Sequence, residues 1–203
     1  SGALLDLNDL LAVDTEWVLI EARDINDSGQ IVGWGYVGDD EEKHAFRFTP
    51  SSDGIQPGTV EDIGTADPDH VASDAYAINN WGDVALRVLN TNGPIYVGVW
   101  QEGEEVDDPP TLTDIGIGSA YPNAMNDFGQ IAAQYNGQNH YGFRYSPGVG
   151  VETFLSLDGE GAPMEVEDIN NSGQVVGGTG FYVGKGKKFR AGVGRYTDGV
   201  GIE

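Results

Sequence analysis

The sequence contains no cysteine and is poor in basic residues, with 10 lysines and arginines against 33 aspartates and glutamates among its 203 residues. Without cysteine there is neither a disulfide framework nor a cysteine nucleophile. The formal charge of −23 makes the surface repel nucleic acid and anionic lipid, so nucleic acid is not expected as a partner. No apolar run approaches the length of a membrane span, so no membrane insertion is expected. No segment shows a convincing helical period, which favours an all-β chain.

A short string that recurs four times is the most informative pattern in the sequence. Each copy has an Asn followed three residues later by a Gly, set between two apolar runs. The copies cover residues 24–32, 77–85, 124–132 and 168–176, and their first Asn residues are Asn26, Asn79, Asn126 and Asn170. Glycine is abundant, at 31 residues, without a low-complexity tract, which indicates many tight turns.

An Asn-x-x-Gly string between apolar runs is typical of a β-hairpin. A type I turn followed by a left-handed residue needs Gly at that last position, and Asn at the start bonds the backbone two residues on. Each Asn is therefore predicted to follow one strand, and each Gly to precede the next. In the second and third units, a further hairpin turn is expected at Asn92-Gly93 and at Asn136-Gly137. The next strand of every unit carries an aromatic at an equivalent place: Phe48, Trp100, Tyr145 and Tyr196.

Four such units make one domain of about four antiparallel strands per unit, with approximate bounds 3–50, 59–101, 111–147 and 151–203. An Asp followed by Leu or Ile opens the first three units, at Asp6, Asp62 and Asp114. One sheet cannot bury both of its faces, so neighbouring units must stack, as the blades of a β-propeller do. We therefore expect an all-β, propeller-like fold. Closure into a ring, membership of a longer array and self-association through open edges, rather than a monomer, all stay open.

Several of these strings resemble one known family. Residues 77–84 (Ala-Ile-Asn-Asn-x-Gly-x-Val), 168–177 (Asp-Ile-Asn-Asn-Ser-Gly-Gln-Val-Val-Gly) and His-Ala-Phe at 44–46 are similar to the HAF repeat family of bacteria and archaea. The third unit departs from the pattern at Met125 and Phe128. The resemblance implies extracellular repeats, often within large secreted or surface proteins, and it supplies no catalytic residues.

Two of the turns carry enough oxygen ligands to suggest calcium. The candidate ligands are Asp24, Asn26, Asp27, Asp168, Asn170 and Asn171. Calcium requires six to eight oxygens and usually a bidentate acid, which neither loop supplies at its end, and the same residues are explained as turn formers. Asp6, Asp62 and Asp114 could converge on a central channel of a propeller, although capping of strand ends is the simpler interpretation. His44 occupies a position where the other units carry Tyr or Gly, which favours a packing or rim role.

Aromatic residues outside the repeated strand ends suggest a ligand surface. Trp81 stands in the turn itself and should face solvent, where it could stack on a sugar ring beside Asn80, with Trp34 as a second candidate. A lone surface aromatic is the plainer alternative.

The sequence predicts an extracellular or cell-surface module that is not an enzyme and needs no cofactor, with calcium as the one possible ion. Its role would be binding or scaffolding, with a glycan, a surface protein or a divalent ion as the ligand. A polysaccharide hydrolase or lyase is the alternative from another class, although no convergent set of catalytic residues can be named. A purely structural spacer without a ligand is the third possibility.

Overall fold

The computed structural model of the chain describes residues 4–39, 42–52, 57–64, 70–91, 93, 95–102, 111–135, 141–154, 164–183, 188–197 and 201–202. Asn92, Asn136 and Gly137, where second hairpin turns are predicted, lie outside these residues. The described chain is all-β apart from one short 3-10 helix, η1 (Leu7–Leu10), which confirms the expected class. Within this part of the chain, no helix is of a length and apolarity that would let it traverse a lipid bilayer.

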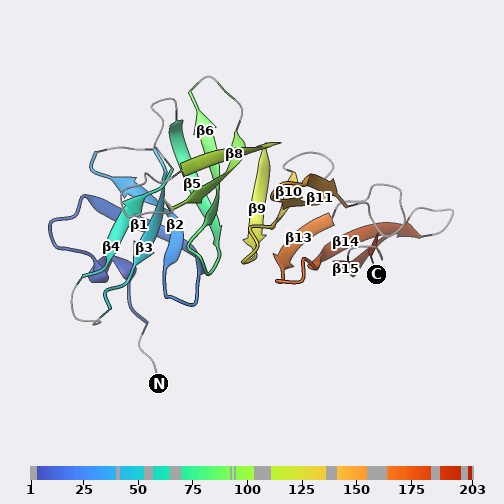
Figure 1. Cartoon of the computed structure of the whole chain (residues 1–203), viewed down its shortest axis with the longest axis horizontal. Coiled ribbons are helices and arrows are strands. Elements are labelled where there is room, and N and C mark those ends of the chain that lie inside the picture. The colour runs from blue at the N-terminus through green and yellow to red at the C-terminus, as the bar shows by residue number, and fades with distance from the viewer. Residues whose placement is uncertain are drawn as a thin grey trace.

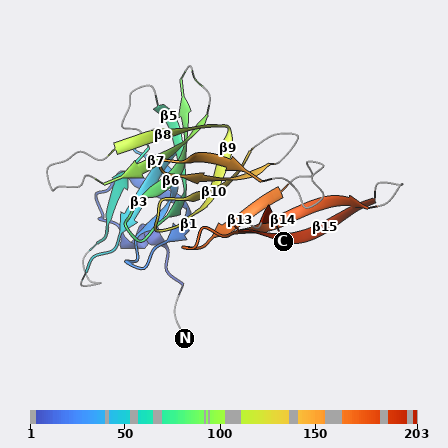
Figure 2. The ribbon, with the colours of Figure 1, turned by 45° about the vertical axis from the view of Figure 1, so that its right-hand side comes forward.

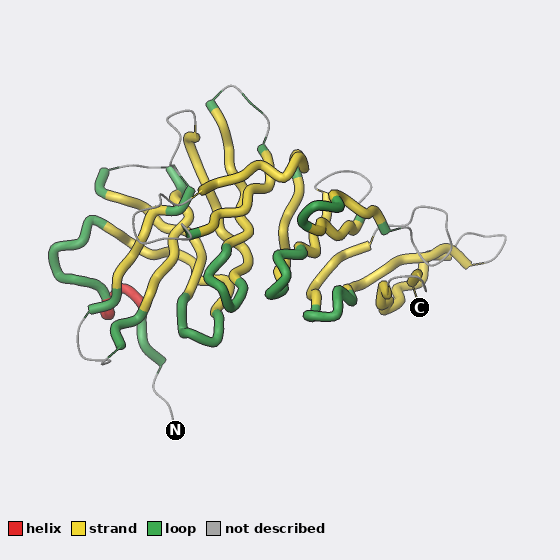
Figure 3. Tube along the Cα trace, viewed as in Figure 1, coloured by secondary structure: helices red, strands yellow, loops and turns green. Residues whose placement is uncertain are grey.

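Four antiparallel sheets of four strands follow one another along the chain, and each is ordered as its strands occur in sequence (Figures 1 and 3). The first sheet consists of β1 (Trp17–Ile25), β2 (Ile31–Val37), β3 (His44–Thr49) and β4 (Thr59–Asp62). The second consists of β5 (His70–Ile78), β6 (Val84–Asn90), β7 (Tyr96–Gln101) and β8 (Thr111–Gly118). The third consists of β9 (Ala120–Met125), β10 (Ile131–Tyr135), β11 (Gly142–Ser146) and β12 (Gly150–Thr153). The fourth consists of β13 (Met164–Ile169), β14 (Val175–Val183), β15 (Lys188–Thr197) and β16 (Gly201–Ile202).

The sheets are offset from the units expected in the sequence. The segments around Asp62 and Asp114, expected to open the second and third units, form the last strands of the first and second sheets, β4 and β8. After each aromatic-bearing strand the chain reverses and pairs at once with it, so that Phe48 lies opposite Val60. Local reversal brings a strand back to its own sheet at the lowest loop-closure cost. The segment around Asp6 has no preceding sheet to join, and it leads into η1 instead.

Alternation along the strands explains how the sheets stack. In β6 the side chains of Val84 and Leu86 pack toward the first sheet, whereas Ala85 between them packs toward the third. A strand buried on both faces reads as a continuous apolar run, as residues 84–86 of this strand do before Arg87 interrupts them. The third cluster joins the third sheet to the fourth through Ala132 and Val175.

A fourth cluster covers the outer face of the first sheet. Leu11 and Leu7, from the segment around η1, pack with Phe46 and Phe48 of β3. The four sheets thus form an open series in which the first and the fourth lie at opposite ends of the molecule (Figures 1 and 2). The first strand of each sheet contacts the first strand of the next, because β1 contacts β5, β5 contacts β9 and β9 contacts β13.

Candidate functional site

Each repeated Asn builds its own turn in the same way. At Asn26 the side-chain oxygen accepts hydrogen bonds from the backbone N–H of Ser28 at 3.1 Å and of Gln30 at 2.9 Å. Its side-chain nitrogen donates to Gln30 Oε1 at 2.8 Å. Gly29 has φ of 77° and donates its N–H to Asn26 O at 2.9 Å. The turns at Asn79, Asn126 and Asn170 repeat these bonds, so the turn predicted from Asn-x-x-Gly is confirmed.

The same Asn residues also join one sheet to the next. The side-chain nitrogen of Asn26 donates to the backbone oxygen of Asn79 at 3.1 Å. Asn79 donates in the same way to Asn126 at 3.5 Å, and Asn126 to Asn170 at 2.9 Å. One side chain therefore closes its own hairpin and bonds the neighbouring hairpin. This explains why asparagine recurs at this position, because its amide offers both an acceptor oxygen and a donor NH₂ group.

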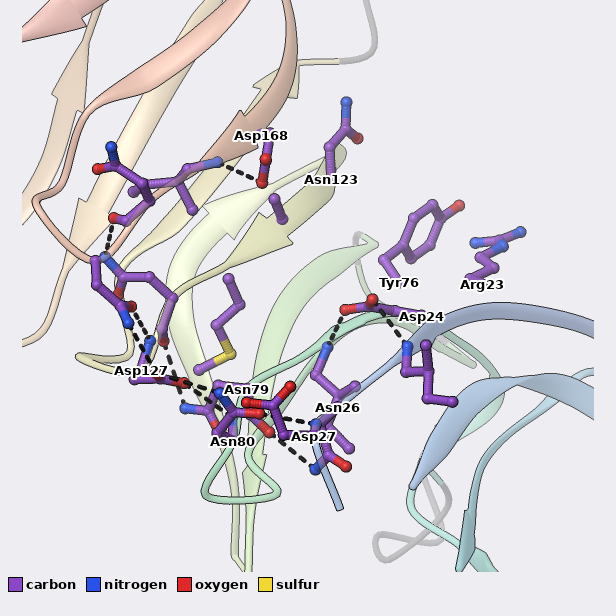
Figure 4. A pocket seen from close by; sticks show the side chains of 18 of the residues that line it. Arg23, Asp24, Asn26, Asp27, Tyr76, Asn79, Asn80, Asn123, Asp127 and Asp168 are labelled. Atoms are coloured by element: carbon purple, nitrogen blue, oxygen red, sulfur yellow. Dashed lines mark hydrogen bonds between the residues drawn. The ribbon is translucent and has the colours of Figure 1, made fainter. Parts of the chain in front are cut away.

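A second row of bonds runs beside the first, one residue further along each turn. The N–H of Asp27 donates to Asn80 Oδ1 at 2.9 Å, and the N–H of Asn80 to Asp127 Oδ1 at 2.9 Å. The N–H of Asp127 donates to Asn171 Oδ1 at 3.0 Å. We call these two rows together the turn ladder; Figure 4 shows its part from Asn26 to Asp127. The pKa of the Asp127 carboxyl is lowered, first by the backbone N–H of Asn80 and then by the side chain of Asn171.

Hydrogen bonds within the turns, beside the ladder and in it occupy most of the side-chain oxygens proposed for calcium. Asp24 accepts from the N–H of Ile25 at 2.9 Å through one oxygen and from the N–H of Ile78 in the next sheet at 2.8 Å through the other. Asp168 accepts from the N–H of Ile169 at 2.8 Å. Among the described residues no group of three acidic or histidine side chains is arranged around a common point for a metal ion. Calcium binding at these loops stays a prediction, and an ion there would have to compete with the turn bonds.

The acids of the Asp-Leu/Ile positions share a different local role. Asp6 accepts from the N–H of Asn8 at 3.0 Å, Asp62 from that of Gly64 at 3.2 Å, and Asp114 from that of Gly116 at 2.8 Å. Each bond spans two residues, as in an Asx turn. Asp62 is the last residue of β4, whereas Asp6 caps the helix η1 and Asp114 lies within β8, so the interpretation as strand-end caps fits Asp62 alone. His44 lies at the rim of the first sheet, where Nδ1 is 2.7 Å from Asp62 Oδ2.

The four turns and the strand ends before them line a concavity of about 710 Å³. Polar side chains from every sheet reach it at one equivalent position, three residues before the repeated Asn: Arg23, Tyr76, Asn123 and Glu167. Asp24, Asp27, Asn80, Asp127, Asp168 and Asn171 complete the polar lining (Figure 4). The concavity therefore combines amide, carboxylate, phenol and guanidinium groups, each contributed by an inner strand or its turn.

Two exposed aromatic side chains stand at equivalent positions of the second and third turns, outside the lining of this concavity, and Phe128 lines a separate hollow with Arg144 and Glu152. Trp81 is 76% exposed and Phe128 is 69% exposed, where the first and fourth turns carry Ser. The indole N–H of Trp81 donates to the backbone oxygen of Asp127 at 2.9 Å, which fixes the ring across two turns while leaving it in solvent. The expected exposure of Trp81 and its proximity to Asn80 are confirmed.

Trp34 lies apart from that pair. Its indole N–H donates to Glu21 at 2.8 Å, and the Lys43 ammonium lies 3.8 Å from the ring centroid. Asn80 and Trp81 are consecutive in the chain, and the structure places the third residue expected to hold a ligand in a cluster with Glu21 and Lys43.

A group of cations and aromatic rings on β1, β5, β6 and β9 was not predicted from the sequence. Arg23 lies 3.9 Å from the ring centroid of Tyr76, and Arg87 lies 4.1 Å from that of Tyr121. Asp74 forms ion pairs with Arg23 at 3.0 Å and with Lys43 at 3.8 Å, and burial raises the pKa of its carboxyl although these cations oppose the rise. The sequence offered one signal for this group, the scarcity of cations. Three of the ten lysines and arginines, Arg23, Lys43 and Arg87, take part in it.

No family model, curated protein or solved structure matches this chain. The functional assignment therefore depends on the geometry of the concavity and on the repeated residues that build it.

Proposed function

We propose that the protein is an extracellular, non-enzymatic binding module of propeller-like architecture, which holds a hydroxyl-rich ligand such as a carbohydrate on its concave face. The observation that carries the proposal is the polar concavity of about 710 Å³, whose lining residue Asn80 directly precedes the exposed Trp81 in the chain. Sugars offer both hydroxyl groups, which exchange hydrogen bonds with amides and carboxylates, and apolar ring faces, which stack on aromatic side chains.

The groups free to meet such a ligand lie beside the ladder rather than within it. The carboxylate of Asp27 accepts no hydrogen bond from another described residue, and Glu167 is exposed at the wall of the concavity. Tyr76 and Arg23 supply a ring and a cation at the opposite wall. Because the ladder fixes the backbone beneath these groups, they are held in place before a ligand arrives, which lowers the entropy cost of binding.

The propeller-like architecture is supported by four successive four-stranded sheets whose first strands adjoin one another along the concave side. Membership of the HAF repeat family is proposed from Asn-Asn-x-Gly at 79–82 and 170–173 and from the single His-Ala-Phe at 44–46, and the extracellular location follows from that resemblance. The charge of −23 suits a module that must stay soluble among neutral or cationic partners.

A glycan array followed by calorimetric titration of the best oligosaccharide tests the proposal. We expect Trp81→Ala to weaken binding by about tenfold or more, because a stacked ring at a binding centre contributes at least 1.4 kcal/mol. Val13→Ala is the control, since it shortens an exposed side chain that lines no part of the concavity and should leave the affinity unchanged.

Three outcomes would contradict the proposal. Equal weakening by Trp81→Ala and Val13→Ala would remove the concave face from the binding site. Turnover of a polysaccharide that is lost in Glu167→Gln would favour a hydrolase or lyase. Absence of any shift in melting temperature with glycans, proteins or calcium would favour a spacer, because a ligand specific to the native state must raise it.

A further inference from the structure

The outer face of the fourth sheet carries the same residues that join one sheet to the next inside the molecule. Its turn reads Asp168, Ile169, Asn170, Asn171, while the turn of the first sheet reads Asp24, Ile25, Asn26, Asp27. In the first sheet, Asp24, Asn26 and Asp27 all bond forward to the second sheet. We define Asp168, Asn170, Asn171 and Val176 as the end face.

The forward bonds are unfilled at the end face. Asn170 Nδ2 donates within its own turn to Gln174 but to no described residue beyond it, and the N–H of Asn171 has no partner among the described residues. Asp168 accepts from its neighbour Ile169 through one oxygen, whereas the other oxygen, which in Asp24 receives the N–H of Ile78, has no described donor.

The apolar contact beside these groups is also missing. Val176 is 39% exposed, although its counterparts Val32, Ala85 and Ala132 are each 0% exposed because the next sheet covers them. In register, Arg195 lies opposite Val176 as Arg47 lies opposite Val32. The fourth sheet therefore has the same strand pairing as a sheet that packs against the next one, but among the described residues no further sheet covers it.

The first sheet presents the complementary half of such a junction. Ile25 is 61% exposed, whereas its counterparts Ile78 and Ile169 are 4% and 6% exposed beneath the preceding sheet. The carboxylate of Asp27 accepts no hydrogen bond from the described residues, although its counterparts Asn80, Asp127 and Asn171 each accept one from the sheet before. The outer part of this face is covered by Leu11, so the open part is the region around the turn.

We propose that the end face of one chain docks on the turn region of the first sheet of a second copy, head to tail. Asn170 Nδ2 and the N–H of Asn171 would bond the backbone oxygen of Asn26 and the carboxylate of Asp27 in the other copy, continuing the turn ladder. Such a contact is heterologous, because the two surfaces that meet are different. Two copies joined at both ends would bring together eight sheets, within the range of closed propellers.

Charge sets the conditions under which this contact forms. Two chains of −23 repel each other, while the junction itself consists of hydrogen bonds and apolar contact. Screening shortens the Debye length from about 10 Å at 0.1 M salt to about 3 Å at 1 M. Association should therefore strengthen as sodium chloride is raised, opposite to a contact held by attraction between charges.

Sedimentation velocity of the full chain over a dilution series, at low and at high salt, tests the proposal. We expect a dimer at high salt, and loss of that dimer in Ile25→Asp and in Val176→Asp, both of which alter exposed side chains. Val149→Asp is the matched control, because Val149 is exposed in the third sheet, away from both ends, and it should leave the dimer intact.

Mixing the two blocked variants distinguishes a head-to-tail contact from any other. Ile25→Asp retains an intact end face and Val176→Asp retains an intact first sheet, so the mixture should form a one-to-one pair that neither variant forms alone. The proposal is overturned if the unaltered chain stays monomeric under all conditions, if its dimer survives either single substitution, or if the mixture stays monomeric.

Discussion

The turn ladder crosses all three junctions between neighbouring sheets. The middle junction, between the second and third sheets, differs from the other two in the side chain that packs next to the ladder. On the two flanking junctions a buried arginine crosses to the next sheet, Arg47 at the first and Arg144 at the third. At the equivalent place in the second sheet stands Val99, which joins an apolar cluster with Ile131 and Phe143.

The arginines bring polar contacts that the valine cannot make. Arg144 donates to the backbone oxygen of Gly173 at 2.7 Å and to Glu152 at 2.6 Å, and its guanidinium lies 5.4 Å from the ring centroid of Tyr196. Arg47 pairs with Glu61 and Glu102 in the same manner. The comparison teaches that the ladder is the constant element of a junction, whereas the contact beside it tolerates either an apolar or an ion-paired side chain.

Removal of a ladder asparagine should lower the free energy of unfolding more than any other change, and by a similar amount at the second and third turns. Asn79→Ala leaves the N–H groups of Trp81 and Asp83 without their acceptor and deletes a bond to the third sheet. We expect a loss of about 3 kcal/mol in the free energy of unfolding, from urea denaturation, for this variant and for Asn126→Ala. Asn170→Ala is the control, with a loss of about 1 kcal/mol, because that exposed turn has no forward bond. Equal losses at all three positions would contradict a ladder between sheets.

Removal of an interface arginine should have the next largest effect, confined to the flanking junctions. Arg144→Met keeps the aliphatic part of the side chain but removes the donor to the oxygen of Gly173 and the cation beside Glu152, whose carboxylate keeps, among the described residues, only the hydroxyl of Tyr196. We expect a loss of about 2 kcal/mol, less than for a fully buried ion pair because Glu152 is exposed. Val99→Met at the second junction removes no polar contact, and its cost in the same denaturation, about 1 to 3 kcal/mol for the added volume, should not change with salt, whereas the cost of Arg144→Met should fall as salt screens its pair with Glu152. Equal salt dependence of the two losses would break the comparison.

Replacing a turn glycine with alanine should destabilise the fold more at a junction that contains an arginine than at the apolar junction, but less than the changes above. Gly173 and Gly129 have φ of 72° and 71°, but a Cβ at Gly173 would lie 3.0 Å from Arg144 Nη1, whereas one at Gly129 would lie 3.2 Å from a carbon of Pro147. Alanine costs about 1 kcal/mol in this backbone region, and Gly173→Ala should cost about as much again by displacing a buried donor. Gly116→Ala, where φ is 77° and no atom lies within 4 Å, measures the strain alone. Thermal denaturation that ranks Gly116→Ala above Gly173→Ala would oppose this account.

The smallest effect concerns pH. The lowered pKa of Asp127 means that its carboxylate stabilises the fold at pH values above its ordinary pKa of 3.8, and that this contribution is lost as the pH falls through the lowered value. Asp127→Asn retains an oxygen to accept the N–H of Asn80, as Asn80 and Asn171 do in their own turns. Its stability, from urea denaturation at pH 7 and pH 3, should therefore fall less on acidification than that of the unaltered chain. An identical decline in both would show that Asp127 does not contribute.

Local rules in the sequence predicted the strands and turns, whereas contacts between sheets were not predictable from it. Asn-x-x-Gly specifies a hairpin by bonds within five residues, so Asn26 and Gly29 were assigned correctly. The forward bond from Asn26 to Asn79 depends on how two sheets stack, and the string is equally consistent with an isolated turn. Trp34 and Trp81 were grouped because both lie outside the repeated aromatic position, but that grouping contains no information about distance.

Amide hydrogen exchange of the four residues that follow the repeated Asn tests the turn ladder most directly. The N–H groups of Asp27, Asn80 and Asp127 bond forward to the next sheet, whereas the N–H of Asn171, in the same kind of turn and as exposed a residue as Asp27 and Asn80, has no described partner. In dilute, low-salt solution, where chains stay apart, the first three should exchange slowly and Asn171 rapidly. Four equally rapid exchange rates would contradict the ladder that joins the sheets.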